Sequence, residues 1–374
     1  MKTGRNLIEL ATEVERLAAA KKDYIVPTGL MHMRDDARIE IQGKGDYDVT
    51  EHTHNQIGER LDIPSKYYDR MRREEPRLLA QNVNTWFEKK SEKRMVRTMT
   101  LERPVMRAFL GDGYRRLDNF ELMQAVLPFI MQEYGKPLRI ESSEVTETRL
   151  HLKVIAPHTE RDLNTLLAPG THKFINEPVQ AGFIVQNSEI GMGAIAVFPF
   201  VDILRCTNGA MVTEYGQRKY HAGRRAGRGM GDDAAFDADS IMSDQTRMLD
   251  DAAFWSKTKD IIRAAISEET VGKIFTKFAE AREMKIIAPP EKVVEVLANN
   301  YGLNEKEKSG VLRTLIDSGM GLTKYGVMNA LTEIAKDEKG ELGLSYDRAT
   351  ELERAGGDII TLGAAEWKQI AEAA

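Results

Sequence analysis

Residues 97–130 read RTMTLERPVMRAFLGDGYRRLDNFELMQAVLPFI, and this stretch predicts the supersecondary unit around which the chain folds. The runs 97–101 and 105–110 have strand character and are separated by Glu-Arg-Pro, and proline fits a turn but not the interior of a β-ladder. A β-hairpin is therefore predicted. The Gly-Asp-Gly sequence at 111–113 permits a tight turn before the next element, because glycine adopts backbone angles that are closed to other residues.

A helix is predicted directly after this turn. Asp118 or Asn119 can act as its N-cap, since a short polar side chain accepts a hydrogen bond from a free backbone N–H. The apolar residues that follow recur at helical spacing. They are Leu122, Val126, Leu127 and Ile130. The whole unit is thus strand, turn, strand, turn and capped helix.

The same unit carries a concentration of arginine around a tyrosine. These residues are Arg97, Arg103, Arg107, Tyr114, Arg115 and Arg116. Arginine binds phosphate through a bidentate fork, and tyrosine stacks on bases, so the pattern fits a nucleic-acid surface. A second interpretation is that the arginines form ion pairs inside the protein with Asp112, Asp118 and Glu121.

The composition is that of a folded chain of 374 residues, long enough for two domains or for one domain with a helical appendage. The N-terminus lacks the apolar core of a signal peptide, and no stretch approaches the about 20 apolar residues of a membrane span. Cys206 is the only cysteine, which excludes an intrachain disulfide and a multi-cysteine zinc site. We therefore expect a cytoplasmic protein that has no membrane partner.

The net charge of −5 conceals two parts of opposite sign. Residues 231–374 contain 27 acidic and 18 basic residues, a net charge of −9, whereas residues 1–230 contain 35 basic and 31 acidic residues, a net charge of +4. A basic front part suits nucleic-acid binding, and an acidic back part suits regulation or a protein partner. Two solvated surfaces that merely differ in charge are the alternative.

A second basic surface is predicted on a strand at 149–155. Leu150, Leu152 and Val154 alternate there with Arg149, His151 and Lys153, which is typical of a half-buried strand with a basic outer face. We expect Arg149 and Lys153 to form a second row of phosphate contacts on this face. The alternative is an ordinary solvated face.

The segment 217–231, QRKYHAGRRAGRGMG, gives the strongest indication of polyanion binding. It has too little apolar surface to fold on itself, and its glycines separate groups that donate to phosphate. The predicted nucleic-acid contacts in it are Arg218, Lys219, Tyr220, Arg224, Arg225 and Arg228.

From Asp232 the pattern becomes acidic and helical. A long helix is predicted at 240–285, before Pro289 and Pro290. Shorter helices are predicted at 291–300, 305–318, 324–336, 346–355 and 364–374. The predicted fold class is α+β: an antiparallel or mixed β-sheet core of five to seven strands with helices packed on one side, in a domain of residues 1–230, followed by an acidic α-helical region, residues 231–374.

Common catalytic signatures are absent from the sequence. There is no GxxxxGK[ST] phosphate loop and no GxSxG, HExxH or GxGxxG motif, so no ATPase, hydrolase or dehydrogenase is indicated, and no cofactor or metal is predicted. His52 and His54 are two residues apart and lie on opposite sides of a helix, which makes a poor metal pair. Cys206 could act as a nucleophile with His221 or His151, but a packing role is the alternative.

Four segments, in this order and spacing, resemble a known family. They are AFLGDGYRRLDN (108–119), QNSEIG (186–191), RCTNG (205–209) and RKYHAG (218–223), and IPSKYYDRM (63–71) also fits. The chain resembles the phage/plasmid-like proteins called domain of unknown function family 932, from about Tyr24 to Gly227. It departs from them at Gly111 and Gly113, where relatives usually have a serine and a basic residue.

The resemblance implies a context of phages, prophages and conjugative plasmids. In outline, the expected strand-rich core is also similar to single-strand annealing recombinases, which assemble as rings or filaments. The leading hypothesis is therefore ATP-independent binding and annealing of single-stranded DNA by a homo-oligomer. Two alternatives stay open: a counter-defence protein whose acidic region binds a host protein, and a metal-dependent nuclease using Asp112, Asp118, Glu189 and His221.

Overall fold

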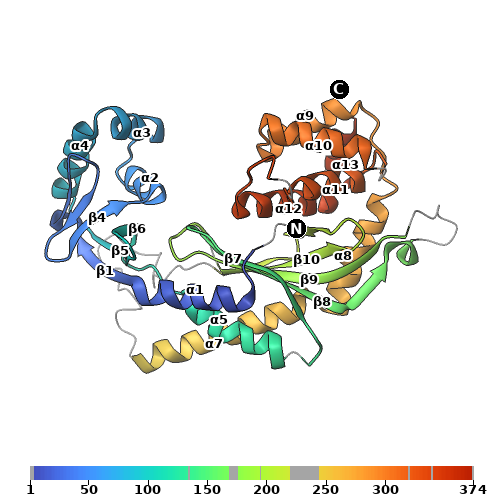
Figure 1. Ribbon diagram of the computed structural model, residues 1–374, viewed down its shortest axis with the longest axis horizontal. Helices are drawn as coiled ribbons and strands as arrows, with labels where there is room; N and C mark the ends of the chain where they lie inside the picture. The colour runs from blue at the N-terminus through green and yellow to red at the C-terminus, as the bar shows by residue number, and fades with distance from the viewer. Residues whose placement is uncertain are drawn as a thin grey trace, which may run out of the picture.

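The chain forms two β-sheets and a helical C-terminal region. The computed structural model describes residues 4–133, 135–167, 176–193, 195–219, 244–318, 321–337 and 340–372. Figure 1 shows the first sheet with its helices on one side of the molecule, the second sheet in the middle, and the C-terminal helices over one face of the second sheet. The predicted α+β class, with strands in the N-terminal part and a helical C-terminal region, is confirmed. The prediction of a single sheet of five to seven strands is wrong, because the described strands form two sheets.

The first sheet contains the predicted hairpin. Strands β5 and β6 pair antiparallel, with a bulge between Arg97 and Thr98, while β4 and β6 pair parallel. In the order in which they lie side by side, its strands are β1 (Lys21–Pro27), β5 (Lys93–Thr100), β6 (Pro104–Gly111), β4 (Gly45–Val49), β3 (Ile39–Ile41) and β2 (Met31–Met33).

Three helices pack on one face of this sheet: α2 (Glu51–Arg60), α3 (Ser65–Glu74) and α4 (Pro76–Lys89). Thr50 caps α2, because its hydroxyl accepts a hydrogen bond from Thr53 N–H. Helices α2 and α3 approach closely at Gly58, where a Cβ atom would lie 3.0 Å from the Tyr68 ring.

The second sheet is antiparallel and has six strands. Its order is β11 (Asn208–Met211), β10 (Ile195–Ile203), β9 (Pro178–Asn187), β8 (Leu150–Asp162) and β7 (Arg139–Val145), and β12 (Gln217–Lys219) pairs with β10 beside β11. One of its faces packs on α1 (Leu7–Ala20), α5 (Asn119–Pro128) and α7 (Asp244–Ala265). The π-helical turn η2 (Phe129–Glu133) follows α5.

The C-terminal helices pack on the second sheet and on one another (Figure 1). They are α8 (Glu268–Ala281), α9 (Pro290–Tyr301), α10 (Glu305–Asp317), α11 (Lys324–Ile334), α12 (Tyr346–Thr361) and α13 (Ala364–Ala371). Helix α12 covers the opposite face of the sheet, where Lys153 lies, whereas α8 shares a core cluster with Val179 and Val201, which lie on the same face as the residues packed against α7. The sequence predicted most of these helices, but it predicted one helix for residues 240–285. The structure has two, α7 and α8, and Ser267 caps the second of them.

The predicted half-exposed strand at 149–155 is corrected by this arrangement. Lys153 on β8 is 0% exposed, and its ammonium group lies 2.6 Å from a carboxylate oxygen of Glu353 on α12, which is also 0% exposed. Helices therefore cover both faces of the second sheet rather than one. Alternation along a strand shows that two faces differ in polarity, but it does not show whether a helix with complementary charge covers the polar one.

No helix in the described parts of the chain is both long enough and apolar enough to cross a membrane.

Candidate nucleic-acid interface

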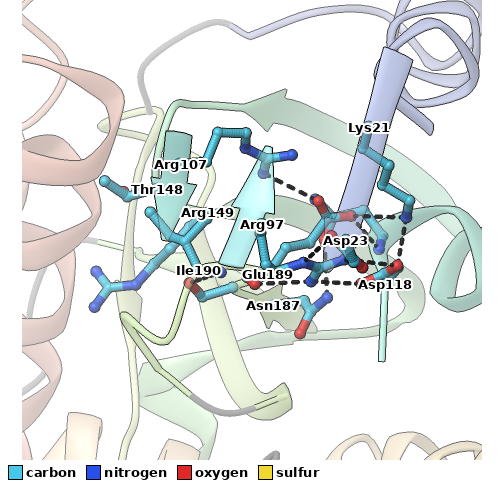
Figure 2. A network of polar contacts seen from close by, with 12 residues as sticks. Lys21, Asp23, Arg97, Arg107, Asp118, Thr148, Arg149, Asn187, Glu189 and Ile190 are labelled. Atoms are coloured by element: carbon cyan, nitrogen blue, oxygen red, sulfur yellow. Dashed lines mark hydrogen bonds and ion pairs between the residues drawn. The ribbon is translucent and has the colours of Figure 1, made fainter. Parts of the chain in front are cut away.

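Arg97, the first residue of the central stretch, is buried at the junction of the two sheets (Figure 2). Its side chain is 1% exposed. The guanidinium group donates to both carboxylate oxygens of Asp23 on β1 at 3.0 Å, to Asp118 at 3.0 Å and to the carbonyl oxygen of Glu189 at 2.8 Å. One arginine thus connects β1, the start of α5 and the loop between β9 and β10.

Asp118 occupies the predicted N-cap position of α5, but its carboxylate accepts no hydrogen bond from the helix N–H groups. It accepts hydrogen bonds from Arg97 and from Lys21. Burial alone would raise the pKa of Asp118, but Arg97 and Lys21 stabilise the ionised form and lower this pKa to about 2. Asp118 is therefore charged at all physiological pH values.

The loop after β9, within QNSEIG, lies against the first sheet through several contacts. The Glu189 carboxylate accepts from the backbone N–H of Asn119 at 2.9 Å and from Arg107 at 3.0 Å. Tyr114 donates its hydroxyl hydrogen to the carbonyl oxygen of Ser188 at 3.1 Å. Gly191 has a φ of 84° and a Cβ atom there would lie 2.7 Å from a Leu110 methyl group, so the turn requires glycine. Arg107 and Tyr114 therefore hold this loop in place.

Arg115 and Arg116 differ in their surroundings. Arg115 forms ion pairs with Asp250 at 2.7 Å and Asp251 at 2.5 Å on α7, and its guanidinium lies 5.5 Å from the centroid of the Phe254 ring. The side chain of Arg116 is 60% exposed, and its ion pair with Asp23 is 3.9 Å long. Arg116 is therefore accessible to a ligand, whereas Arg115 is held by α7.

The interpretation that the central arginines form internal ion pairs thus describes Arg97, Arg107 and Arg115. Of the acidic partners considered from the sequence, Asp118 pairs with one of these three arginines. The other partners come from distant segments: Asp23, Glu189, Asp250 and Asp251. Arg103 lies exposed in the turn between β5 and β6, beside a shallow cavity of about 200 Å³.

Arg149 and β12 lie at the same end of the second sheet. Arg149 precedes β8 and donates to the carbonyl oxygen of Met192 at 2.7 Å. A Cβ atom on Gly193 would lie 3.7 Å from the Arg149 Nε atom, and Ile195, two residues further on, pairs with Lys219. The backbone of Arg218 and Lys219 on β12 is therefore close to Arg149. The other predicted contacts, Tyr220, Arg224, Arg225 and Arg228, lie outside the described residues.

The residues of the nuclease alternative lie in surroundings that do not favour a bound metal ion. Asp118 and Glu189 lie together, but Lys21, Arg97 and Arg107 already neutralise their carboxylates. The described residues contain no group of three or more His, Cys, Asp or Glu side chains that could hold a metal ion. Two further candidates do not complete such a group: Asp112 lies on an exposed turn, and His221 is outside the described residues.

Cys206 is placed as a packing residue rather than as a nucleophile. Its side chain packs against the large core cluster beneath the C-terminal helices. Burial, with the nearby charges of Glu177 and Glu333, raises the pKa of the Cys206 thiol to about 11, so it is protonated at neutral pH. His151 is bonded to Asp347 and Gln186.

The two histidines of α2 make separate contacts. His52 Nε2 lies 2.9 Å from the carbonyl oxygen of Ile190, and His54 Nδ1 lies 3.0 Å from the Tyr68 hydroxyl. His54 is 4% exposed, and burial together with the charge of Arg72 lowers its pKa to about 4. His54 is therefore neutral in the folded protein.

This burial predicts a pH dependence of stability. Unfolding returns the pKa of His54 to about 6.5, so the unfolded chain binds the proton more readily than the folded chain between pH 6.5 and 4. We expect His54 to make the free energy of unfolding fall by about 3 kcal/mol as the pH falls through this window. Urea titrations at a series of pH values measure this, and His54→Gln, whose amide does not titrate, should flatten the profile. Equal profiles for both proteins would contradict the assignment.

Comparison of the chain with protein-family models, with curated proteins and with solved structures finds no match. The class that the fold and the site define is an α+β protein whose two sheets are joined by a buried ion-pair network.

Proposed function

We propose that this protein binds single-stranded nucleic acid through phosphate contacts, without ATP hydrolysis. The observation that supports this most is the position of β12. This strand carries Arg218 and Lys219, continues into the Gly/Arg-rich sequence, and lies at the end of the second sheet where Arg149 is found. Positive groups along one edge track a nucleic-acid backbone, and glycines between arginines let the chain follow it.

The cations proposed to contact phosphate are those that internal ion pairs leave accessible. Of the predicted contact residues whose side chains the structure describes, these are Arg103, Arg116 and Arg149; the sequence adds Arg224, Arg225 and Arg228. Lys153 is withdrawn from the set because it is buried against Glu353. We further propose that the protein acts in the cytoplasm as a homo-oligomer and promotes annealing, since cations that neutralise two backbones lower the repulsion between strands.

Replacement of Arg224, Arg225 and Arg228 together by alanine should weaken binding of single-stranded DNA and make it less sensitive to salt. Each phosphate contact on a single strand contributes about −0.7 to the slope of log affinity against log salt, so the slope should become shallower by about 2. Fluorescence anisotropy with labelled single-stranded DNA, duplex DNA and single-stranded RNA, between about 50 and 200 mM salt, measures both quantities.

A matched control removes the same charge elsewhere. Arg70, Arg73 and Arg77 are exposed on α3 and α4, and their replacement by alanine should leave most of the salt dependence intact. An equal loss in both triple variants would indicate general charge attraction rather than a defined surface. Wild-type protein that binds no nucleic acid at either salt concentration would exclude the proposed function.

A further inference from the structure

A cavity of about 210 Å³ lies between the second sheet and α12, at the end of the sheet where Arg149 is found. Its apolar side comes from strands β10 and β11, and its polar side comes from β9, α12 and the residues next to β8. The residues that matter for its chemistry are Arg149, Gln186, Phe198, Met211, Thr350 and Arg354. This cavity is separate from the Arg97 network, whose charged groups are paired with one another.

The amide of Gln186 is held in a defined orientation at this cavity. The Asp347 carboxylate accepts from His151 Nε2 at 2.6 Å, and hydrogen bonds from His151, Thr148 and Thr146 keep it ionised although burial opposes this, so that its pKa is lowered to about 2. His151 is therefore a donor at Nε2 and an acceptor at Nδ1, which lies 3.1 Å from Gln186 Nε2.

Gln186 consequently directs one N–H toward His151 and retains an acceptor and a donor. Within the described part of the chain, its Oε1 atom and its second N–H make no hydrogen bond. An amide that presents one acceptor beside one donor matches the edge of a nucleobase, and glutamine pairs in this way with adenine. Phe198 and Met211 are 3% and 2% exposed, so they form a small apolar floor of the cavity against which part of a base can pack.

Two arginines line the same cavity from different elements. Arg149 comes from the start of β8, and Arg354 comes from α12, where its side chain is 48% exposed and its ion pair with Asp358 is 3.7 Å long. An exposed pair of this length contributes little, so Arg354 can exchange it for a phosphate. Glu351 is also in the lining, but it is paired with Arg348 at 3.0 Å.

We propose that this cavity binds one base of a single strand, with its edge on the Gln186 amide and the adjacent phosphates on Arg149 and Arg354. The proposal rests on the proposed function, and it adds that the protein reads bases as well as phosphates. Pockets for drug-sized ligands usually enclose about 300–1,000 Å³, so a cavity of this size accommodates a single ring system rather than a longer segment. Adenine is the base that the amide favours.

The test compares single strands that contain bases with single strands of the same length whose central nucleotides are abasic. Wild-type protein should bind the base-containing strand more tightly by about 5- to 100-fold, the range typical of one bound base. Gln186→Leu should remove most of this difference while leaving the affinity for the abasic strand unchanged. Arg354→Ala should weaken binding of both strands.

A second variant adds bulk to the cavity lining without adding a charge or a hydrogen-bonding group. Gly193 lies in the lining, is exposed, and a Cβ atom there would make only ordinary contacts with the Arg149 side chain, at 3.7 Å and 3.9 Å. Gly193→Leu should abolish the preference for base-containing strands. Gly111→Leu is the control, because Gly111 is exposed and a Cβ atom there would have no neighbour within 4 Å.

The outcomes separate the two proposals. Salt-sensitive binding of both strands with equal affinity in wild type would overturn the base pocket and retain the proposed function. A preference that survives in both Gln186→Leu and Gly193→Leu would place base recognition elsewhere and would also overturn it. Absence of binding to either strand would overturn the proposed function itself.

Discussion

Arg97→Met is expected to lower the free energy of unfolding by about 3–5 kcal/mol, the range for removing one partner of a buried charge cluster. Methionine keeps most of the length and apolar volume of arginine but cannot donate to Asp23 and Asp118. Their side chains are 10% and 8% exposed, so both would remain buried with too little positive charge to stabilise them. Urea denaturation followed by circular dichroism measures the change.

Two further variants make this expectation specific. Arg16 is paired with Glu13 on the surface of α1 and is 50% exposed, so Arg16→Met should leave the free energy of unfolding nearly unchanged. Adding Asp23→Asn and Asp118→Asn to Arg97→Met should recover part of the loss, since the uncompensated negative charge is then removed. A loss below about 1 kcal/mol for Arg97→Met would show that the network does not support the junction of the sheets.

The local elements of this junction could be predicted from the sequence. The hairpin of β5 and β6, the position of Asp118 at the start of α5, and most C-terminal helices follow from turn residues, caps and periodicity, which act over a few positions. The strands β1, β2 and β4 were not predicted. β2 is short, and β1 begins with three charged residues that hide its pairing with β5.

The partners of the arginines could not be predicted, because they depend on contacts between distant segments. Asp23 is 74 positions from Arg97, and Glu353 is 200 positions from Lys153. The sequence shows that a charge is present, but the tertiary fold decides whether it faces solvent or a countercharge. The same limit applies to Gln186, the first residue of the QNSEIG segment. The sequence does not indicate a binding role for Gln186, because the cavity that it lines is formed by β9 and α12 together.

Loss of the buried ion pair between Lys153 and Glu353 is also expected to cause a large fall in the free energy of unfolding. Burial alone would lower the pKa of Lys153, but Glu353 and Tyr346 raise it, so the lysine remains charged in the core. Lys153→Met should reduce the free energy of unfolding by about 3–5 kcal/mol, because Glu353 is then left buried without its cation. Urea denaturation of the full chain measures this loss, and Lys273→Met, on the exposed face of α8, serves as the surface control.

Lys153→Met combined with Glu353→Leu should recover most of the loss, since an apolar pair fills a similar volume without a desolvation penalty. A double variant as unstable as the single one would show that the lost stability comes from packing rather than from the unpaired carboxylate. The recovered variant also separates stability from function. The double variant keeps α12 on the sheet and therefore keeps the Gln186 cavity. Its preference for base-containing strands should equal that of wild type. Lys153→Met should lose this preference at urea concentrations that detach α12.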